Sequence, residues 1–241
     1  MILTAHQPTY LPWLGLIHKI MLADAYVSFD DVQYVPKEWI NRNKIKTQNG
    51  PIWLTVPVLD KGYLESGLTI KDIMINNNLP WRKKHWMSIY LNYKKAPYFN
   101  QTSDFFEDLY KQDWVKICDL NEYVLKYLLK ELGIDVSWHK LSEMTVSGSK
   151  NDLVLSMCKE LNTDLYIFGA LGKDYADVKS FNDQGMDVMF QEYIHPKYPQ
   201  LHGEFESHLS ILDLLFNVDI KNVKDIILMG NISKDQLKKS R

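Results

Sequence analysis

The first residue in this sequence that could carry out chemistry is a histidine directly after a short apolar run. The run Met1–Ala5 has the length of a buried strand, and the strand breaker Pro8 follows shortly after it. His6 therefore stands at the predicted end of a strand. An imidazole at such a place can pass protons near neutral pH or hold phosphate oxygens. In the alternative interpretation, His6 only satisfies backbone groups beside Pro8.

Two adjacent carboxylates, Asp30 and Asp31, follow the second apolar run, Tyr26–Phe29. Neighbouring residues of a strand point to opposite faces of the sheet. At most one of the two carboxylates therefore faces a given site, unless the strand has already ended before them. Either carboxylate could orient His6, act as a base, or bind ribose hydroxyls or a metal. A solvated strand exit or a helix cap is the alternative. Gln33 joins this pair if the following loop folds back.

The segment 35–49 is rich in Lys, Asn and Arg and lacks the apolar period of a helix or a strand, which predicts a loop. Within it, Trp39, Arg42 and Asn43 combine an indole, a guanidinium and an amide. These groups suit phosphates, carboxylates or sugar hydroxyls, and the indole can stack on a ring. We predict that Arg42 binds an anion, with a solvated surface loop as the alternative.

Polar candidates for substrate binding also occur in the second half of the chain. A polar, aromatic loop follows the last predicted strand and could reach the same cleft as His6. A Ser-Gly-Ser-Lys stretch precedes a predicted helix, where it could cap the helix or receive phosphate. These candidates are Ser147, Ser149, Lys150, His195, Tyr198 and Gln200, and Tyr175 of the separate stretch Lys173-Asp174-Tyr175 is a further one.

The elements that must position these residues alternate between strand and helix. Parallel strands need crossover connections, so this alternation predicts an α/β fold with an open, mainly parallel sheet and helices on both faces, similar to a Rossmann fold. His6 would then lie near the centre of the sheet, at the edge where ligands collect. The predicted strands are Met1–Ala5, Tyr26–Phe29, Val136–His139, Leu165–Phe168 and Val188–Phe190.

A mostly helical middle segment, residues 79–133, interrupts this alternation, and we predict that it is an insert or subdomain within one α/β domain spanning residues 1–241. The runs Trp53–Val58 and Leu68–Ile75 are predicted as short strands that pair antiparallel. The charged tail, Lys234–Arg241, is expected to fray.

Composition excludes several classes of protein. A chain of 241 residues with 46% hydrophobic residues can bury a sizeable core. The formal charge of -2 gives no reason to expect binding to nucleic acid or to an anionic membrane. No run approaches the roughly 20 apolar residues that a membrane span needs. Cys118 and Cys158 fall inside helical patterns, which favours a cytoplasmic protein with reduced thiols.

Familiar catalytic motifs are missing from the sequence. No Cys/His spacing indicates a zinc site, and Walker A, G-x-G-x-x-G and G-x-S-x-G patterns do not occur. No metal ligands are therefore predicted, and the sequence does not identify a cofactor. The layout is similar to nucleotide-binding α/β transferases with a loop histidine and a late Ser/Lys loop. The second histidine of that pattern is missing, because His18 lies inside the first predicted helix. The analogy therefore supports recognition of a nucleotide more than it supports the reaction of those transferases.

Several spaced motifs together resemble the WbqC-like family, which is associated with bacterial surface-polysaccharide (O-antigen) gene clusters. The resemblance runs nearly end to end. Its motifs include His6-Gln7-Pro8-x-Tyr10-Leu11-Pro12-Trp13, Lys19, Asp30-Asp31-Val-Gln33, Trp39-x-Asn41-Arg42-Asn43, Lys173-Asp174-Tyr175 and His195-Pro-x-Tyr198-x-Gln200.

The resemblance implies an enzyme of surface-polysaccharide biosynthesis that acts on a nucleotide-activated sugar by acyl or aminoacyl transfer to an amino sugar. His6, Asp30 and Asp31 would be catalytic, and Gln7, Tyr10 and Lys19 would join the substrate-binding residues. Its partners would be a small-molecule substrate and an acyl or aminoacyl donor. A nucleotidyltransferase and a non-catalytic protein that binds nucleotide sugars or assists glycan assembly are the alternatives.

Overall fold

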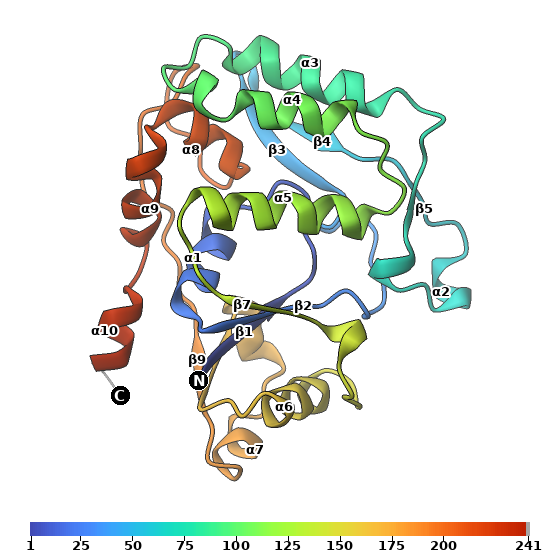
Figure 1. The fold of residues 1–241 in the computed structure, drawn as a ribbon, viewed down its shortest axis with the longest axis vertical. Helices are drawn as coiled ribbons and strands as arrows, with labels where there is room; N and C mark the ends of the chain where they lie inside the picture. Colours follow the sequence, from blue (N-terminus) through green and yellow to red (C-terminus); the bar gives the residue numbers. More distant parts are fainter. Residues whose placement is uncertain (240–241) are drawn as a thin grey trace.

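A computed structural model, which describes residues 1–239, shows one five-stranded parallel sheet (Figure 1). The strand order is β7-β2-β1-β8-β9, so β1 is the central strand. This confirms the prediction of a parallel sheet centred on the first strand. The strands are β1 (Ile2–His6), β2 (Ala25–Ser28), β7 (Ser137–Lys140), β8 (Leu165–Phe168) and β9 (Asp187–Phe190).

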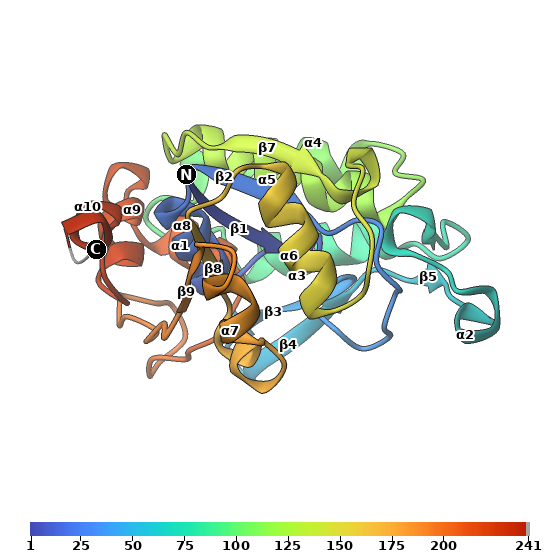
Figure 2. The same ribbon diagram turned by 90° about the horizontal axis from the view of Figure 1, so that it is seen from below.

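The sheet is doubly wound. From β1 the chain proceeds outward to β2 and β7, and it then crosses to β8 on the other side of β1 and continues to β9. The direction of winding therefore reverses between β1 and β8. Helices cover both faces, as predicted: α1 (Leu14–Leu22) and α5 (Ile117–Glu131) on one, α6 (Asn151–Glu160) and α7 (Val178–Asn182) on the other (Figures 1 and 2).

Two short hairpins follow β2. The first pairs β3 (Arg42–Thr47) with β4 (Gly50–Thr55), and the second pairs β5 (Val58–Leu59) with β6 (Met74–Ile75). The prediction of a loop over residues 35–49 is thus wrong for β3, whose inward residues Asn43 and Ile45 are buried while polar residues alternate with them.

The two predicted strands of this region are also correct only in part. The run Trp53–Val58 is divided between β4 and β5, and β4 pairs with β3 rather than with the later run. Of Leu68–Ile75, the first part forms a 3₁₀ turn, Ile70–Asp72, and only Met74–Ile75 is strand. Between the two lies α2 (Tyr63–Ser66).

The middle segment is helical, as predicted. It contains α3 (Trp81–Tyr93), a 3₁₀ turn (Phe99–Gln101), α4 (Ser103–Lys111) and α5, and Gly133 follows the end of α5 with a φ of 58°. A left-handed residue at this position favours glycine. Apolar side chains of α3, α4 and α5 share one core with α1.

The chain ends in three helices, α8 (Ile211–Asn217), α9 (Ile220–Leu228) and α10 (Lys234–Lys239). The prediction of a frayed tail is wrong for α10, because Leu237 is buried in a small cluster with Ile2 and Leu22. Residues 240 and 241 of that tail lie outside the described residues. No helix within residues 1–239 combines the length and the apolar character that crossing a membrane requires.

Candidate functional site

A cavity of about 510 Å³ opens where the winding of the sheet reverses. The ends of β1 and β8 form its floor, and the first half of α1 and the loops after β2, β8 and β9 form its walls. In open α/β sheets, ligands bind outside the carboxyl ends of the strands at this reversal point. Polar and aromatic lining residues include His6, Thr9, Trp13, Lys19, Glu38, Trp39, Tyr175, Gln191, Tyr193, His195 and His208.

His6, the last residue of β1, is a neutral imidazole in this cavity. Its Nδ1 lies 2.8 Å from the carbonyl oxygen of Gln7, to which it can donate, and Nε2 has no hydrogen-bond partner within residues 1–239. The edge of the ring packs against Trp13 at 5.2 Å between centroids. Burial of the ring and the nearby positive charge of Lys19 lower the pKa of His6 to about 3. Nε2 therefore carries no proton at neutral pH and can accept a hydrogen bond.

Lys19 projects from α1 to the gap between β1 and β8. Its Nζ donates to the carbonyl oxygen of Ala5 at 2.9 Å, and a Cβ on Gly169 would lie 4.0 Å from it. The side chain is buried, and no carboxylate pairs with it within the described part of the chain. Burial lowers the pKa of the amine to about 7. A buried cation without a counter-ion, next to a cavity, favours binding of an anion.

The remaining polar atoms of the lining leave further bonding capacity. Glu38 is the one carboxylate among the described lining residues, and it is exposed at the rim. Thr9 Oγ1 and His195 Nε2 are buried and have no partner within residues 1–239. Burial lowers the pKa of His195, with a smaller contribution from His208, so its Nε2 can accept a hydrogen bond. Together these groups can bind several hydroxyl or amino groups of a ligand.

The structure does not place Asp30 or Asp31 among the lining residues of the cavity. β2 ends at Ser28, and Asp30 accepts hydrogen bonds from the backbone N–H of Ser142 at 2.9 Å and from its hydroxyl. Asp31 is exposed and pairs with Lys71 at 2.9 Å. Because β2 ends before Asp30, the chain has already left the sheet at the two carboxylates, and they do not lie in the cavity with His6.

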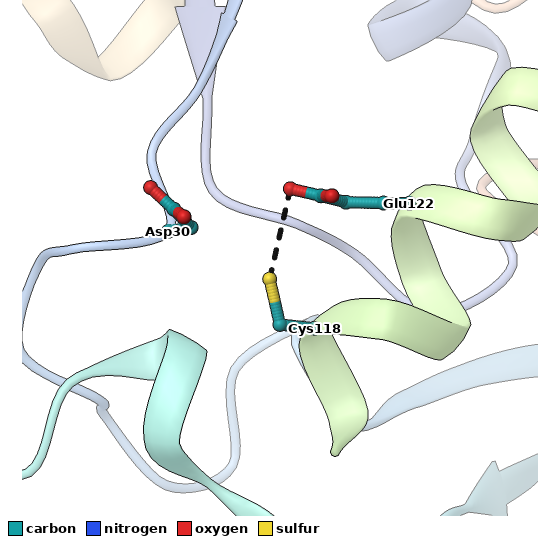
Figure 3. A group of neighbouring side chains, drawn as sticks. All are labelled: Asp30, Cys118 and Glu122. Carbon is teal, nitrogen blue, oxygen red and sulfur yellow. Dashed lines mark hydrogen bonds between the residues drawn. The ribbon is translucent and has the colours of Figure 1, made fainter. Parts of the chain in front are cut away.

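Asp30 belongs instead to a buried cluster with Cys118 and Glu122 of α5 (Figure 3). Their potential ligand atoms all lie within 4.8 Å of one another, a spacing that could hold a metal ion. Glu122 already accepts from Ser28 at 2.7 Å and pairs with Lys140 at 2.6 Å. Burial and the two carboxylates raise the pKa of Cys118, which keeps the thiol protonated. The three side chains are therefore better explained as part of a cluster of hydrogen bonds and an ion pair that connects α5 to the sheet.

Arg42 also lies outside the lining of the cavity, but it is connected to it. Its guanidinium lies 4.4 Å from the ring centroid of Trp53, and it donates to the carbonyl oxygen of Lys37. Trp53 is 5.4 Å from Trp39, which lines the cavity. Asn43 is buried and donates to the carbonyl oxygen of Leu11 at 2.5 Å. The hairpin β3–β4 thus supports one side of the cavity mouth.

Several other predicted residues have structural partners away from the cavity. Tyr10 is buried and hydrogen-bonds His85 and Tyr110. Tyr198 is buried, and Gln200 accepts from Lys46 at 3.0 Å. The cavity brings together His6, Gln7, Lys19, Trp39, Tyr175 and His195. Its lining does not include Tyr10, Asp30, Asp31, Gln33, Arg42, Asn43, Ser147, Ser149, Lys150, Tyr198 or Gln200.

Sequence reasoning missed several lining residues. Gln191 directly follows β9 and donates to the carbonyl oxygen of Gly15 at 2.9 Å, so the strand-end rule that selected His6 would have found it. Glu38 stands in a segment rich in cations and amides, a pattern that indicates anion binding and does not single out a carboxylate. Thr9 and Tyr193 carry no comparable signal, since only the folded chain brings them to the cavity.

A doubly wound parallel sheet with a cavity at its reversal point defines a Rossmann-like α/β fold, and in such folds this is the place where ligands bind. The chain belongs to the WbqC-like protein family, whose family model matches residues 7–225. It is also 32% identical over 214 residues to a Mycobacterium tuberculosis protein named "Uncharacterized protein Rv1507c", covering 88% of this chain and 91% of the relative. The resemblance inferred from the sequence motifs is thereby confirmed.

Proposed function

We propose that the protein is a cytoplasmic enzyme of bacterial surface-polysaccharide biosynthesis that transfers an acyl or aminoacyl group to a nucleotide-activated amino sugar. The observation that carries this proposal is the uncompensated amine of Lys19 beside the neutral imidazole of His6, between the ends of β1 and β8. The association of the WbqC-like family with polysaccharide gene clusters supports the substrate class.

The charges around the cavity suit a substrate with both a phosphate and an amine. The ammonium of Lys19 is enclosed and lacks a counter-ion within residues 1–239, so a diphosphate can supply the missing negative charge. Glu38 at the rim can receive an ammonium or sugar hydroxyls, and the ring of Trp39 can pack against a sugar or a base. A neutral sugar would leave the charge of Lys19 uncompensated.

The proposed reaction needs a proton acceptor, which His6 provides. The amine nitrogen of the sugar attacks the carbonyl carbon of the acyl donor, a C–N bond forms, and the bond between the acyl carbon and its leaving group breaks. The proton lost by the amine passes to Nε2 of His6 and then to the leaving group. A positioned acid or base of this kind contributes roughly 10²- to 10⁴-fold to the rate.

A non-catalytic function in binding nucleotide sugars is the second candidate. The specific observation in its favour is that neither Asp30 nor Asp31 lies beside His6 to orient the imidazole or to raise its basicity. The histidine would then serve only as a hydrogen-bond acceptor for the ligand.

Calorimetry followed by mass spectrometry tests both candidates. Purified protein is titrated with UDP- and dTDP-linked amino sugars, and any that bind are incubated with a set of acyl and aminoacyl donors. The proposal requires binding that Lys19→Met abolishes, together with a mass increase of the sugar that His6→Ala prevents. Binding without any covalent product would favour the non-catalytic function, and binding of none of these nucleotides would contradict both.

A further inference from the structure

We propose that the outer face of the β3–β4 hairpin is a second anion-binding site, which holds the phosphorylated nucleotide portion of a coenzyme A-type acyl donor. Arg42, Lys44 and Trp53 form this site, called here the hairpin site. The role of this ligand as an acyl donor rests on the proposed function, whereas binding of its nucleotide portion does not.

The register of the hairpin brings the three side chains to one face. Lys44 is directly opposite Trp53, and Arg42 lies two residues from Lys44 on the same side of β3. The guanidinium of Arg42 is 4.4 Å and the amine of Lys44 is 5.1 Å from the ring centroid of Trp53. Neither cation pairs with a carboxylate within residues 1–239. Two cations held beside one indole make a fixed site for a phosphate next to a stacking surface.

The guanidinium is also anchored. One of its N–H groups donates to the carbonyl oxygen of Lys37, while Nε is buried without a partner within the described residues. Lys37 has a φ of 67°, an unusual conformation for a residue with a side chain, and this contact helps to hold it. An anchored cation loses less conformational freedom when a phosphate binds than a free surface lysine does.

A row of aromatic rings connects the hairpin site to the catalytic cavity. Trp53 is 5.4 Å from Trp39, Trp39 is 5.7 Å from Trp13, and Trp13 is 5.2 Å from His6, all between ring centroids. Trp13 and Trp39 line the cavity. A ligand bound at the hairpin site can therefore lay a long flexible arm across these rings and present its end to His6. A compact donor could not reach both places.

A nucleotide fits the exposed ring better than an inorganic anion does. Trp53 is 43% exposed in spite of its neighbouring cations, so part of its ring is open to a base. Stacking on an aromatic side chain tolerates any base, and Arg adds a cation–π contribution. Coenzyme A combines a base, several phosphates and a long arm, and it is therefore the probe of choice.

Calorimetry with coenzyme A and with adenosine 3′,5′-bisphosphate tests the hairpin site. We expect Lys44→Gln and Trp53→Ala each to weaken binding of both probes roughly 5- to 10-fold, the factor that loss of one stacking or cation contact produces. In Lys44→Gln the affinity for the nucleotide sugar, measured separately, should not change, because Lys44 lies outside the lining of the cavity. Lys83→Gln is the matched control, because Lys83 lies in a different groove beside Trp86.

The outcomes separate this inference from the proposed function. Equal affinity of coenzyme A for the parent and both variants, or no affinity for the parent, would overturn the hairpin site while leaving the nucleotide-sugar cavity intact. Competition between adenosine 3′,5′-bisphosphate and the nucleotide sugar would overturn it as well, since both would then occupy the cavity. Binding at the hairpin without acyl transfer would sustain the site and remove only the acyl-transfer function.

Discussion

Replacing Lys19 with methionine should make the protein more stable at mildly acidic pH, although it removes a proposed ligand-binding group. Burial lowers the pKa of the amine from 10.5 to about 7. At about 1.4 kcal/mol per pKa unit, the charged amine destabilises the folded state by about 5 kcal/mol. Removing the charge therefore stabilises the variant. Loss of the hydrogen bond from Nζ to Ala5 offsets about 1 kcal/mol of this stabilisation, and rearrangement of the cavity around the methionine side chain offsets more. We expect a net gain of about 2–4 kcal/mol in the free energy of unfolding.

The contribution of Lys19 to the free energy of unfolding should depend on pH. Between the folded pKa near 7 and the unfolded value of 10.5, the unfolded chain binds a proton at Lys19 that the folded chain does not bind. The contribution of this group to stability therefore rises with pH across that window, and below it the penalty stays constant. In Lys19→Met this rise disappears, so the two proteins should converge in stability as the pH increases.

Urea denaturation at several pH values from about 6 to 9 measures both effects. Lys140→Met is the control, because Lys140 pairs with the buried Glu122 at 2.6 Å and its removal leaves that carboxylate uncompensated. The control should lose about 2 kcal/mol, a value reduced for the partial exposure of Lys140. A Lys19→Met protein that is less stable than the parent, or that keeps the parent's pH dependence, would refute the interpretation of Lys19 as an uncompensated cation.

Three further predictions concern the same cavity. His6→Ala should lower turnover roughly 10²- to 10⁴-fold with little change in affinity or melting temperature, as steady-state kinetics, calorimetry and a thermal melt would show, and an unchanged rate would remove His6 from the mechanism. Because the pKa of His6 is about 3, the pH profile of kcat/KM should lack an acid limb near pH 6.5 but fall above about pH 7 as Lys19 loses its proton; an acid limb that His6→Ala abolishes would contradict this. Gly172→Ala should lower the free energy of unfolding by about 1–3 kcal/mol, because its Cβ would lie 2.5 Å from Cβ of Phe168, and urea unfolding at parent-like stability would show that the loop yields.

The parallel sheet could be predicted from the sequence because its inner strands are mainly apolar runs separated by helices, whereas the edge strands β7 and β9 are less apolar. Burial on both faces produces this pattern in β1 and β8 without help from distant residues. Strand β3 could not be found in this way. Its residues are mostly polar, and only pairing with β4 and burial of Asn43 and Ile45 make the segment a strand.

From the pattern of strands, the site could be predicted only where a strand end determines the position of a side chain, whereas Lys19 and Tyr175 are expected from the family motifs that contain them. His6 meets this condition, because β1 ends at the point of reversal. Asp30 does not, since β2 has ended and Ser142 binds its carboxylate. The pKa of Lys19 depends on burial by residues that are far away in the sequence, and no local pattern reports it. The catalytic and binding roles of these residues stay predictions.

A crystal structure of the protein with a bound nucleotide-linked amino sugar tests the central claim most directly. We expect the diphosphate within hydrogen-bond distance of Nζ of Lys19, and the amine of the sugar within reach of Nε2 of His6, in the cavity between β1 and β8. A nucleotide sugar bound elsewhere, such as the groove beside Arg82 and Trp86, with this cavity empty, would contradict the claim.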